Sequence, residues 1–115
     1  MTSATNLMDK ISFEEFQKLD IRVGKVLSSE KIIDSEKLLK LEVDIGKEKR
    51  QIIAGIAKVY DPDELVGKSF VVLVNLEPRE IVGFESQGMI LCADAGEGPV
   101  CLAPIKEVPP GTKIL

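Results

Sequence analysis

The segment 38–45 constrains the fold more than any other part of the sequence, because its side chains alternate between apolar and charged from Leu39 to Ile45. The apolar positions are Leu39, Leu41, Val43 and Ile45, and the charged positions between them are Lys40, Glu42 and Asp44. A period of two is typical of an antiparallel strand with one buried face. The Gly-Lys-Glu-Lys segment at 46–49 then predicts a tight turn, with a return strand over residues 50–54.

Other short segments carry strand patterns. Ile21 and Val23 open a strand, and Gly24 within it predicts a bulge or sharp bend. Continuous apolar runs predict buried strands over 69–75 and 87–93. A turn at residues 94–98 lets a short strand over residues 100–102 pair back.

Two short helices are predicted from their starting residues. Ser12 and Glu15 form a capping box, so a helix should run to about Leu19, with Phe13, Phe16 and Leu19 on one face. Asp61, Pro62 and Glu64 occupy the first positions of a second helix, and Gly67 ends it.

The predicted order is three strands, one helix, and then two or more strands. A helix between the third and fourth strands is typical of the five-stranded OB barrel. We therefore expect an all-β OB-fold barrel with an added N-terminal helix and a Pro-rich C-terminal extension. Residues 12–115 should form this single domain, and residues 1–11 a flexible tail.

The composition removes most catalytic chemistry. The chain has no histidine, which excludes imidazole bases, histidine triads and histidine metal ligands. Cys92 and Cys101 cannot fill a four-thiolate zinc site, and their apolar neighbours predict buried free thiols. Helix capping accounts for the acidic residues of the two helices. We assign no catalytic residue, no metal and no cofactor, and expect a binding module rather than an enzyme.

No run of 18 apolar residues and no secretory signal pattern occurs in the sequence. The expected location is therefore the cytoplasm, without membrane association, and a disulfide is not expected there.

Charge is divided unevenly along the chain. Residues 22–58 contain nine Lys/Arg and six Asp/Glu, which gives a net charge of +3. Residues 59–115 contain four Lys/Arg and nine Asp/Glu, which gives a net charge of −5. A polyanion should therefore meet the first half. Lys37, Lys40, Lys49 and Arg50 in this half are candidate phosphate contacts.

Polar residues also stand where buried strands meet loops. Asn75, Ser86 and Gln87 occupy such positions, and Gly83 and Gly88 nearby allow close backbone approach. Turn chemistry alone explains them as well as a small hydrogen-bonding pocket for RNA bases does. In the pocket interpretation, the Ser86 hydroxyl is partly exposed.

Four segments in order along residues 13–103 carry a family resemblance. They are 16–24 (FQKLDIRVG), 34–41 (DSEKLLKL), 50–55 (RQIIAG), and 75–76 (NL) with 86–89 (SQGM). The chain resembles the tRNA-binding domain found at the C-terminus of methionyl-tRNA synthetases, as their beta subunit, and as a stand-alone structure-specific tRNA-binding protein.

The resemblance implies an OB barrel, a homodimer, and binding to the outer corner of folded tRNA. It places on the tRNA-facing side the residues Lys37, Arg50, Asn75, Ser86 and Met89. The chain departs from the family pattern at Ala54, where a serine is frequent, and at residues 33–34, where His-Pro is common.

Two function classes follow. The first is a non-catalytic tRNA-binding module that raises the tRNA affinity of a methionyl-tRNA synthetase catalytic subunit. The second is a chaperone-like, peptide-binding homodimer of the same fold. A small-molecule enzyme comes third, because the chain lacks histidine.

Overall fold

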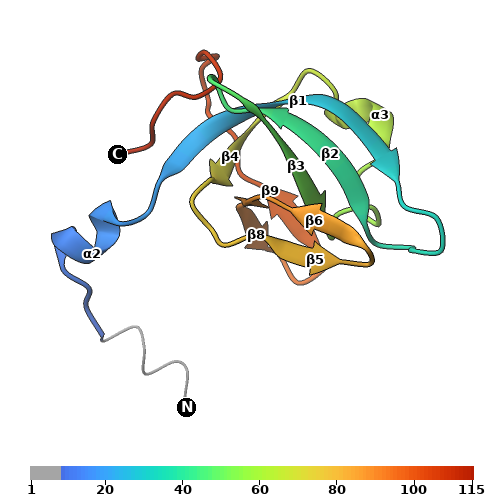
Figure 1. Cartoon of the computed structure of the whole chain (residues 1–115), viewed down its shortest axis with the longest axis horizontal. Coiled ribbons are helices and arrows are strands. Elements are labelled where there is room, and N and C mark those ends of the chain that lie inside the picture. Colours follow the sequence, from blue (N-terminus) through green and yellow to red (C-terminus); the bar gives the residue numbers. More distant parts are fainter. Residues whose placement is uncertain (1–8) are drawn as a thin grey trace.

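The computed structural model describes residues 9–115, so the predicted tail lies outside the described residues except for positions 9–11. The elements in chain order are α2 (Phe13–Gln17), β1 (Ile21–Lys31), β2 (Leu39–Asp44), β3 (Lys49–Ala54), α3 (Pro62–Leu65), β4 (Ser69–Leu73), β5 (Arg79–Ile81), β6 (Phe84–Ser86), β7 (Met89–Ile90), β8 (Cys92–Asp94) and β9 (Pro99–Cys101) (Figure 1).

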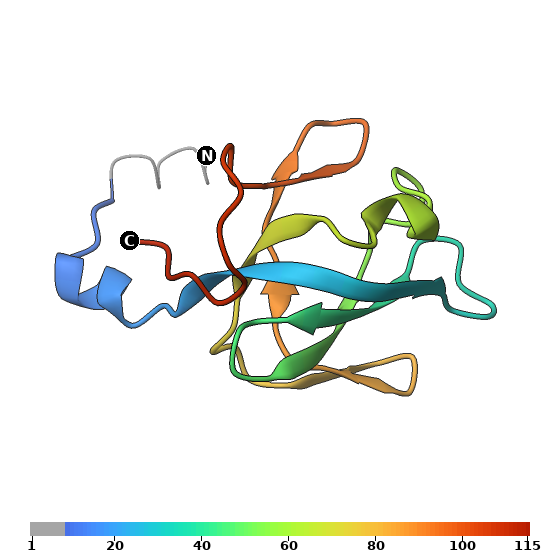
Figure 2. The same ribbon diagram turned by 90° about the horizontal axis from the view of Figure 1, so that it is seen from above.

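A five-stranded antiparallel sheet in the order β3-β2-β1-β4-β7 curls into a nearly closed barrel. Strand β1 makes this possible because it is long enough to cross the whole barrel (Figure 2). Its first part pairs with β4, from Ile21 opposite Leu73, and its second part pairs with β2, from Lys25 opposite Asp44. Helix α3 lies between β3 and β4 in the chain, so the OB-fold prediction is confirmed.

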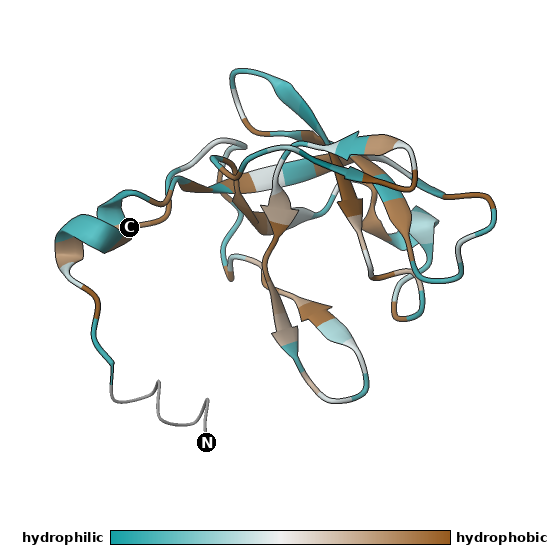
Figure 3. Cartoon of the chain, turned by 60° about the horizontal axis from the view of Figure 1, so that its bottom comes forward, coloured by the Kyte–Doolittle hydropathy of each residue, from teal (hydrophilic) through white to brown (hydrophobic). Residues whose placement is uncertain are grey.

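The alternating segment forms β2 as predicted, and its apolar side chains fill the barrel. The hydrophobic core contains buried residues from all five strands of the sheet, chiefly Val26, Leu39, Leu41, Val43, Ile52, Phe70, Val72 and Ile90. Figure 3 shows brown, hydrophobic stretches on the barrel strands and a mostly hydrophilic α2. The turn after β2 is also confirmed, with the Ile45 N–H donating to the Glu48 carbonyl at 3.0 Å.

Gly24 does not form the predicted bulge, which lies instead between Val26 and Ser28. A β-carbon added at Gly24 would lie 2.6 Å from Val43 Cγ1 and 2.9 Å from Val72 Cγ2. A glycine is therefore needed at this position of β1, because a larger residue would clash with buried side chains of the two neighbouring strands, β2 and β4.

Gly24→Ala is expected to lower the free energy of unfolding by about 1–3 kcal/mol, because both facing valines are buried and cannot move without strain. Gly55→Ala is the matched control, since a β-carbon there meets nothing within 4 Å. Urea unfolding of the two variants measures the difference. Equal stabilities would contradict the expectation and show that Val43 and Val72 can move to accommodate a methyl group at residue 24.

Both helices begin where the sequence places them. The Ser12 hydroxyl accepts from the Glu15 N–H at 3.1 Å, and the Glu64 carboxylate accepts from the Asp61 N–H at 2.9 Å. Helix α2 ends at Gln17 rather than near Leu19, and it buries no residue. Phe13 and Phe16 stack on each other with centroids 6.3 Å apart, while Phe13 remains exposed.

The second half of the chain is more divided than predicted. The expected strand over 87–93 is two strands, β7 and β8, because the chain changes partner at Leu91. The Leu91 N–H still donates to the Val71 carbonyl on β4, whereas the Leu91 carbonyl accepts from the Leu102 N–H, and β8 then pairs with β9. The hairpin β5–β6 was not predicted, since three-residue strands with few apolar side chains carry no clear period.

The C-terminal extension runs back beside β1. The Ile114 N–H donates to the Ile21 carbonyl at 2.8 Å, and the Val23 N–H donates to the Thr112 carbonyl at 2.9 Å. The chain therefore ends on the α2 side of the barrel in both views (Figures 1 and 2). Over residues 9–115, the helices are too short to cross a membrane.

Candidate nucleic-acid interface

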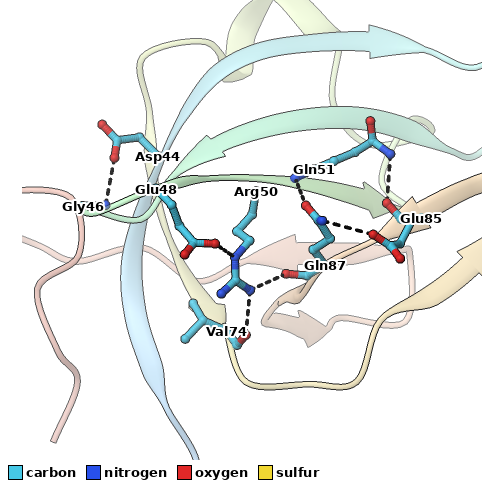
Figure 4. A network of polar contacts seen from close by, with 8 residues as sticks. All are labelled: Asp44, Gly46, Glu48, Arg50, Gln51, Val74, Glu85 and Gln87. Carbon is cyan, nitrogen blue, oxygen red and sulfur yellow. Dashed lines mark hydrogen bonds and ion pairs between the residues drawn. The ribbon is translucent and has the colours of Figure 1, made fainter.

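The barrel is closed between β3 and residues 85–88 by side chains rather than by a regular ladder (Figure 4). The Gln51 N–H donates to Gln87 Oε1 at 3.0 Å, and the Ile53 N–H donates to Ser86 Oγ at 3.0 Å. In the other direction, the Gln87 N–H donates to the Gln51 carbonyl at 2.7 Å. Ser86 and Gln87 thus supply the acceptors that a neighbouring strand would provide.

Ser86 is buried, with 5% of its surface exposed, so the expectation of a partly exposed hydroxyl is wrong. Its hydroxyl also donates to the Gly88 carbonyl at 3.2 Å. Both hydrogen-bonding capacities of the side chain are therefore used inside the protein, because the hydroxyl completes the closure of the barrel.

Ser86→Ala is expected to lower the free energy of unfolding by about 1–3 kcal/mol, because the buried Ile53 N–H loses its acceptor. Ser28→Ala, at an exposed position on β1, should change it by less than about 0.5 kcal/mol. Thermal and urea unfolding measure both variants. A Ser86→Ala protein as stable as the Ser28→Ala protein would mean that another group satisfies Ile53.

Arg50 is held at the end of the barrel by the same closure. Its Nη1 donates to the Val74 carbonyl at 2.9 Å and to the Gln87 carbonyl at 3.0 Å, and its Nε pairs with Glu48 (Figure 4). Only 24% of its side chain is exposed. Arg50 therefore joins β3, the end of β4 and residue 87, and these contacts leave the Nη2 group of its guanidinium for a ligand.

Asn75 also makes contacts within the protein. Its Oδ1 accepts from the Asp20 N–H at 2.8 Å, and its Nδ2 donates to the Lys18 carbonyl at 2.6 Å. The residue itself is exposed. Its amide fixes the link between α2 and β1 against the end of β4.

The predicted lysines differ in their surroundings. Lys40 pairs with Glu30 at 2.8 Å and lies 4.8 Å from the centre of the Phe84 ring. Lys49 is exposed at the start of β3. Lys37 is exposed before β2 and shares an open depression with Lys58.

A groove runs between β3 and the segment β5–β7, and we call it the β3–β7 groove. It consists of two cavities of about 40 and 260 Å³ that share four lining residues, Ile53, Arg79, Ile81 and Met89. The smaller cavity also meets Leu76 and Ser86, and the larger one meets Leu38. Met89 is 40% exposed, so its thioether is available to a ligand in the groove.

The seven predicted site residues lie in the groove, in a separate depression, or next to residues that line the groove. Ser86 and Met89 line the β3–β7 groove itself. Lys40, Lys49 and Arg50 line a separate polar depression of about 400 Å³, together with Gln51 and Gln87. Lys37 adjoins the groove through its neighbour Leu38.

Asn75, the seventh, adjoins the groove through Leu76. Its engaged amide places it at the margin of the groove rather than inside it.

Sequence reasoning missed Arg79, an exposed cation that lines both cavities of the groove. It stands in the acidic half of the chain, so the charge pattern gave no reason to select it. Its position opposite Ser86 in the β5–β6 hairpin is what brings it to the groove. Its place directly after Pro78, in a segment already carrying Asn75, was the available signal.

The groove offers cationic, apolar and hydrogen-bonding groups, together with one acidic side chain, Glu77, in its smaller cavity. Among residues 9–115, no three His, Cys, Asp or Glu side chains gather as metal ligands would. The arrangement can hold an anionic, partly apolar ligand by contact alone.

Comparison with known proteins relates the whole barrel to a translation family. Residues 21–113 match the family described as "Putative tRNA binding domain". Methionine–tRNA ligase of Archaeoglobus fulgidus is 56% identical over 106 residues, which cover 92% of this chain and 16% of the ligase. The corresponding ligase of Thermotoga maritima is 50% identical over 104 residues, which cover 90% of this chain and 16% of the ligase. The chain thus spans about a sixth of the length of these ligases.

Solved structures share the fold over their full length. A MetRS related protein from Pyrococcus horikoshii superposes with a TM-score of 0.87 at 41% identity, covering 94% of this chain and 100% of that one. The chaperone CsaA from Bacillus anthracis superposes with a TM-score of 0.83 at 37% identity, covering 92% and 99%. The match over residues 21–113, together with these full-length structural relatives, shows that the chain belongs to the tRNA-binding domain family.

Proposed function

We propose that this domain binds folded tRNA through the β3–β7 groove and its cationic margins, and that it performs no chemistry itself. The observation that carries the proposal is the convergence of distant segments on one groove. Residues from β3, from 76–81 and from 86–90 line it, and Lys37 and Asn75 stand beside lining residues. Three of the four segments that carry the family resemblance, 34–41, 50–55 and 75–76 with 86–89, contribute residues to this lining.

The charges on the groove suit a folded polyanion. Arg79 is exposed in the groove, where the acidic lining residue is Glu77, and Lys37 is exposed beside it. The separate depression is lined by three cations, Lys40, Lys49 and Arg50, and by two acids, Glu30 and Glu42. Cations at the margin meet phosphates, which position RNA without reading its sequence. Recognition of the shape of the tRNA outer corner follows, since the chain has one tyrosine and no tryptophan for stacking bases.

A homodimer is part of the proposal. Ile11 is exposed just before α2, Phe13 is exposed at its start, and Leu115 is exposed at the C-terminus, which lies on the same side of the barrel in Figure 1. Pairing two copies through this side would cover these residues and present two grooves to one tRNA. Light scattering at tens of micromolar protein is expected to give twice the monomer mass; a monomer mass would contradict it.

The partner in the cell is a methionyl-tRNA synthetase catalytic unit, whose tRNA affinity this domain raises. Its relatives carry the name methionine–tRNA ligase, and this chain matches only a sixth of their length. Adding the domain to a ligase that lacks it should lower KM for tRNA and leave kcat nearly unchanged, because only binding is supplied.

The alternative is peptide binding, which the CsaA structures and the apolar groove residues Ile53, Ile81 and Met89 favour. Salt separates the two functions. Fluorescence anisotropy with labelled tRNA should show affinity falling steeply as salt rises from about 50 to 200 mM. Binding of an unfolded apolar peptide that resists salt, with no tRNA binding at low salt, would favour the chaperone-like function instead.

A further inference from the structure

The two cysteines of the chain face each other across the β8–β9 hairpin. Cys92 and Cys101 are directly opposite in register, and their sulfur atoms lie 3.6 Å apart. The Cys101 N–H donates to the Tyr60 hydroxyl at 3.0 Å instead of bonding across the hairpin. The two residues therefore form a non-hydrogen-bonded pair, the position at which opposite side chains approach most closely.

Their surroundings leave the sulfurs reachable. The sequence predicts buried thiols, but both residues are only partly buried, packed against the edge of the hydrophobic core. Cys92 also lines the larger cavity of the β3–β7 groove, which opens to solvent. A small reagent can therefore approach Cys92 from the groove.

We propose that Cys92 and Cys101 form a reversible redox modification site, which closes to a disulfide on exposure to an oxidised low-molecular-weight thiol such as oxidised glutathione. A disulfide requires sulfurs about 2.05 Å apart, so the two must approach by about 1.5 Å. Rotation about the two Cα–Cβ bonds can supply this movement, because the backbones are already paired.

The reaction has two steps. The Cys92 thiolate attacks one sulfur of oxidised glutathione, breaking its S–S bond and releasing one glutathione thiolate. Cys101 then attacks the Cys92 sulfur of the mixed disulfide, loses its proton to water, and displaces the second glutathione. Two protein thiols are oxidised and one glutathione disulfide is reduced by the same two electrons.

Cys92 is the residue that reacts first. Burial, followed by the neighbouring Cys92 sulfur, raises the pKa of Cys101 to about 12, so Cys101 is protonated at neutral pH. Because the thiolate is the nucleophile, closure should be slow at pH 7 and faster at pH 9. The cross-link would join β8 to β9 and fix the wall of the groove that Cys92 and Pro99 form.

The test treats the full chain with oxidised glutathione, stops the reaction with acid, and measures intact mass. The wild type is expected to lose the mass of two hydrogens and to retain no glutathione, and dithiothreitol should reverse this. Cys101→Ser should instead retain one glutathione, since its Cys92 adduct cannot be resolved. The double variant Cys92→Ser/Cys101→Ser should not change in mass.

Circular dichroism of the serine variants serves as the control for folding. Wild-type protein that keeps both thiols free, carries glutathione adducts, or forms cross-linked pairs of chains would overturn the proposal. Each of these outcomes means that the two sulfurs do not combine within one hairpin.

Discussion

The double variant Lys37→Glu/Arg79→Glu is expected to bind folded tRNA about 2–4 kcal/mol more weakly than the wild type, a loss of roughly thirtyfold to several hundredfold. Arg79 is exposed in the β3–β7 groove, and Lys37 is exposed next to Leu38, which lines the larger cavity. Each reversal replaces attraction to phosphate by repulsion. Neither side chain takes part in a hydrogen bond or ion pair within the described part of the chain. The melting temperature should therefore change little.

The control for net charge is Lys68→Glu/Lys106→Glu. These lysines line a different cavity, of about 630 Å³, between the start of β4 and the C-terminal extension. The change in total charge is the same, so filter binding of both double variants separates a local contact from general repulsion. An equal loss of affinity in the two proteins would remove the groove from the proposed interface.

Arg50→Ala is expected to lower the free energy of unfolding by about 2–4 kcal/mol, because two backbone carbonyls lose a charged donor. Arg50→Lys should recover part of this loss, since one ammonium group cannot reproduce the planar fork that reaches Val74 and Gln87 together. Urea unfolding of the two variants measures the difference. A stable Arg50→Ala protein with weakened tRNA binding would mean that Arg50 acts mainly as an RNA contact.

The first half of the barrel could be predicted from local patterns. The alternation in β2 and the turn at Gly46 specify a hairpin because burial and turn chemistry agree there. The capping residues Ser12 and Asp61 likewise mark the helix starts. In each case the interaction that determines the structure lies within a few residues in sequence.

The failures have a common physical cause, which is contact between distant segments. Gly24 is required by Val43 and Val72, and no local pattern distinguishes close packing from a bulge. Ser86 is buried because it satisfies the Ile53 N–H, 33 positions away.

At the candidate site, the residue types indicated which side chains could bind RNA, but not which of them are free to do so in the folded protein. Arg50 and Asn75 are polar, yet the side chains of both form hydrogen bonds with the backbone of the protein itself. Arg79 is available because the β5–β6 hairpin, which has no sequence signature, carries it to the groove.

Mapping bound tRNA on the protein by amide chemical shifts tests the central claim most directly. Titration with folded tRNA is expected to shift the amides of Lys37, of residues 50–54 and of residues 76–90, which surround the β3–β7 groove. The amides of Lys68 and Lys106, at the other cavity, should stay in place. Shifts concentrated at Lys68 and Lys106, with the groove amides unmoved, would contradict the account.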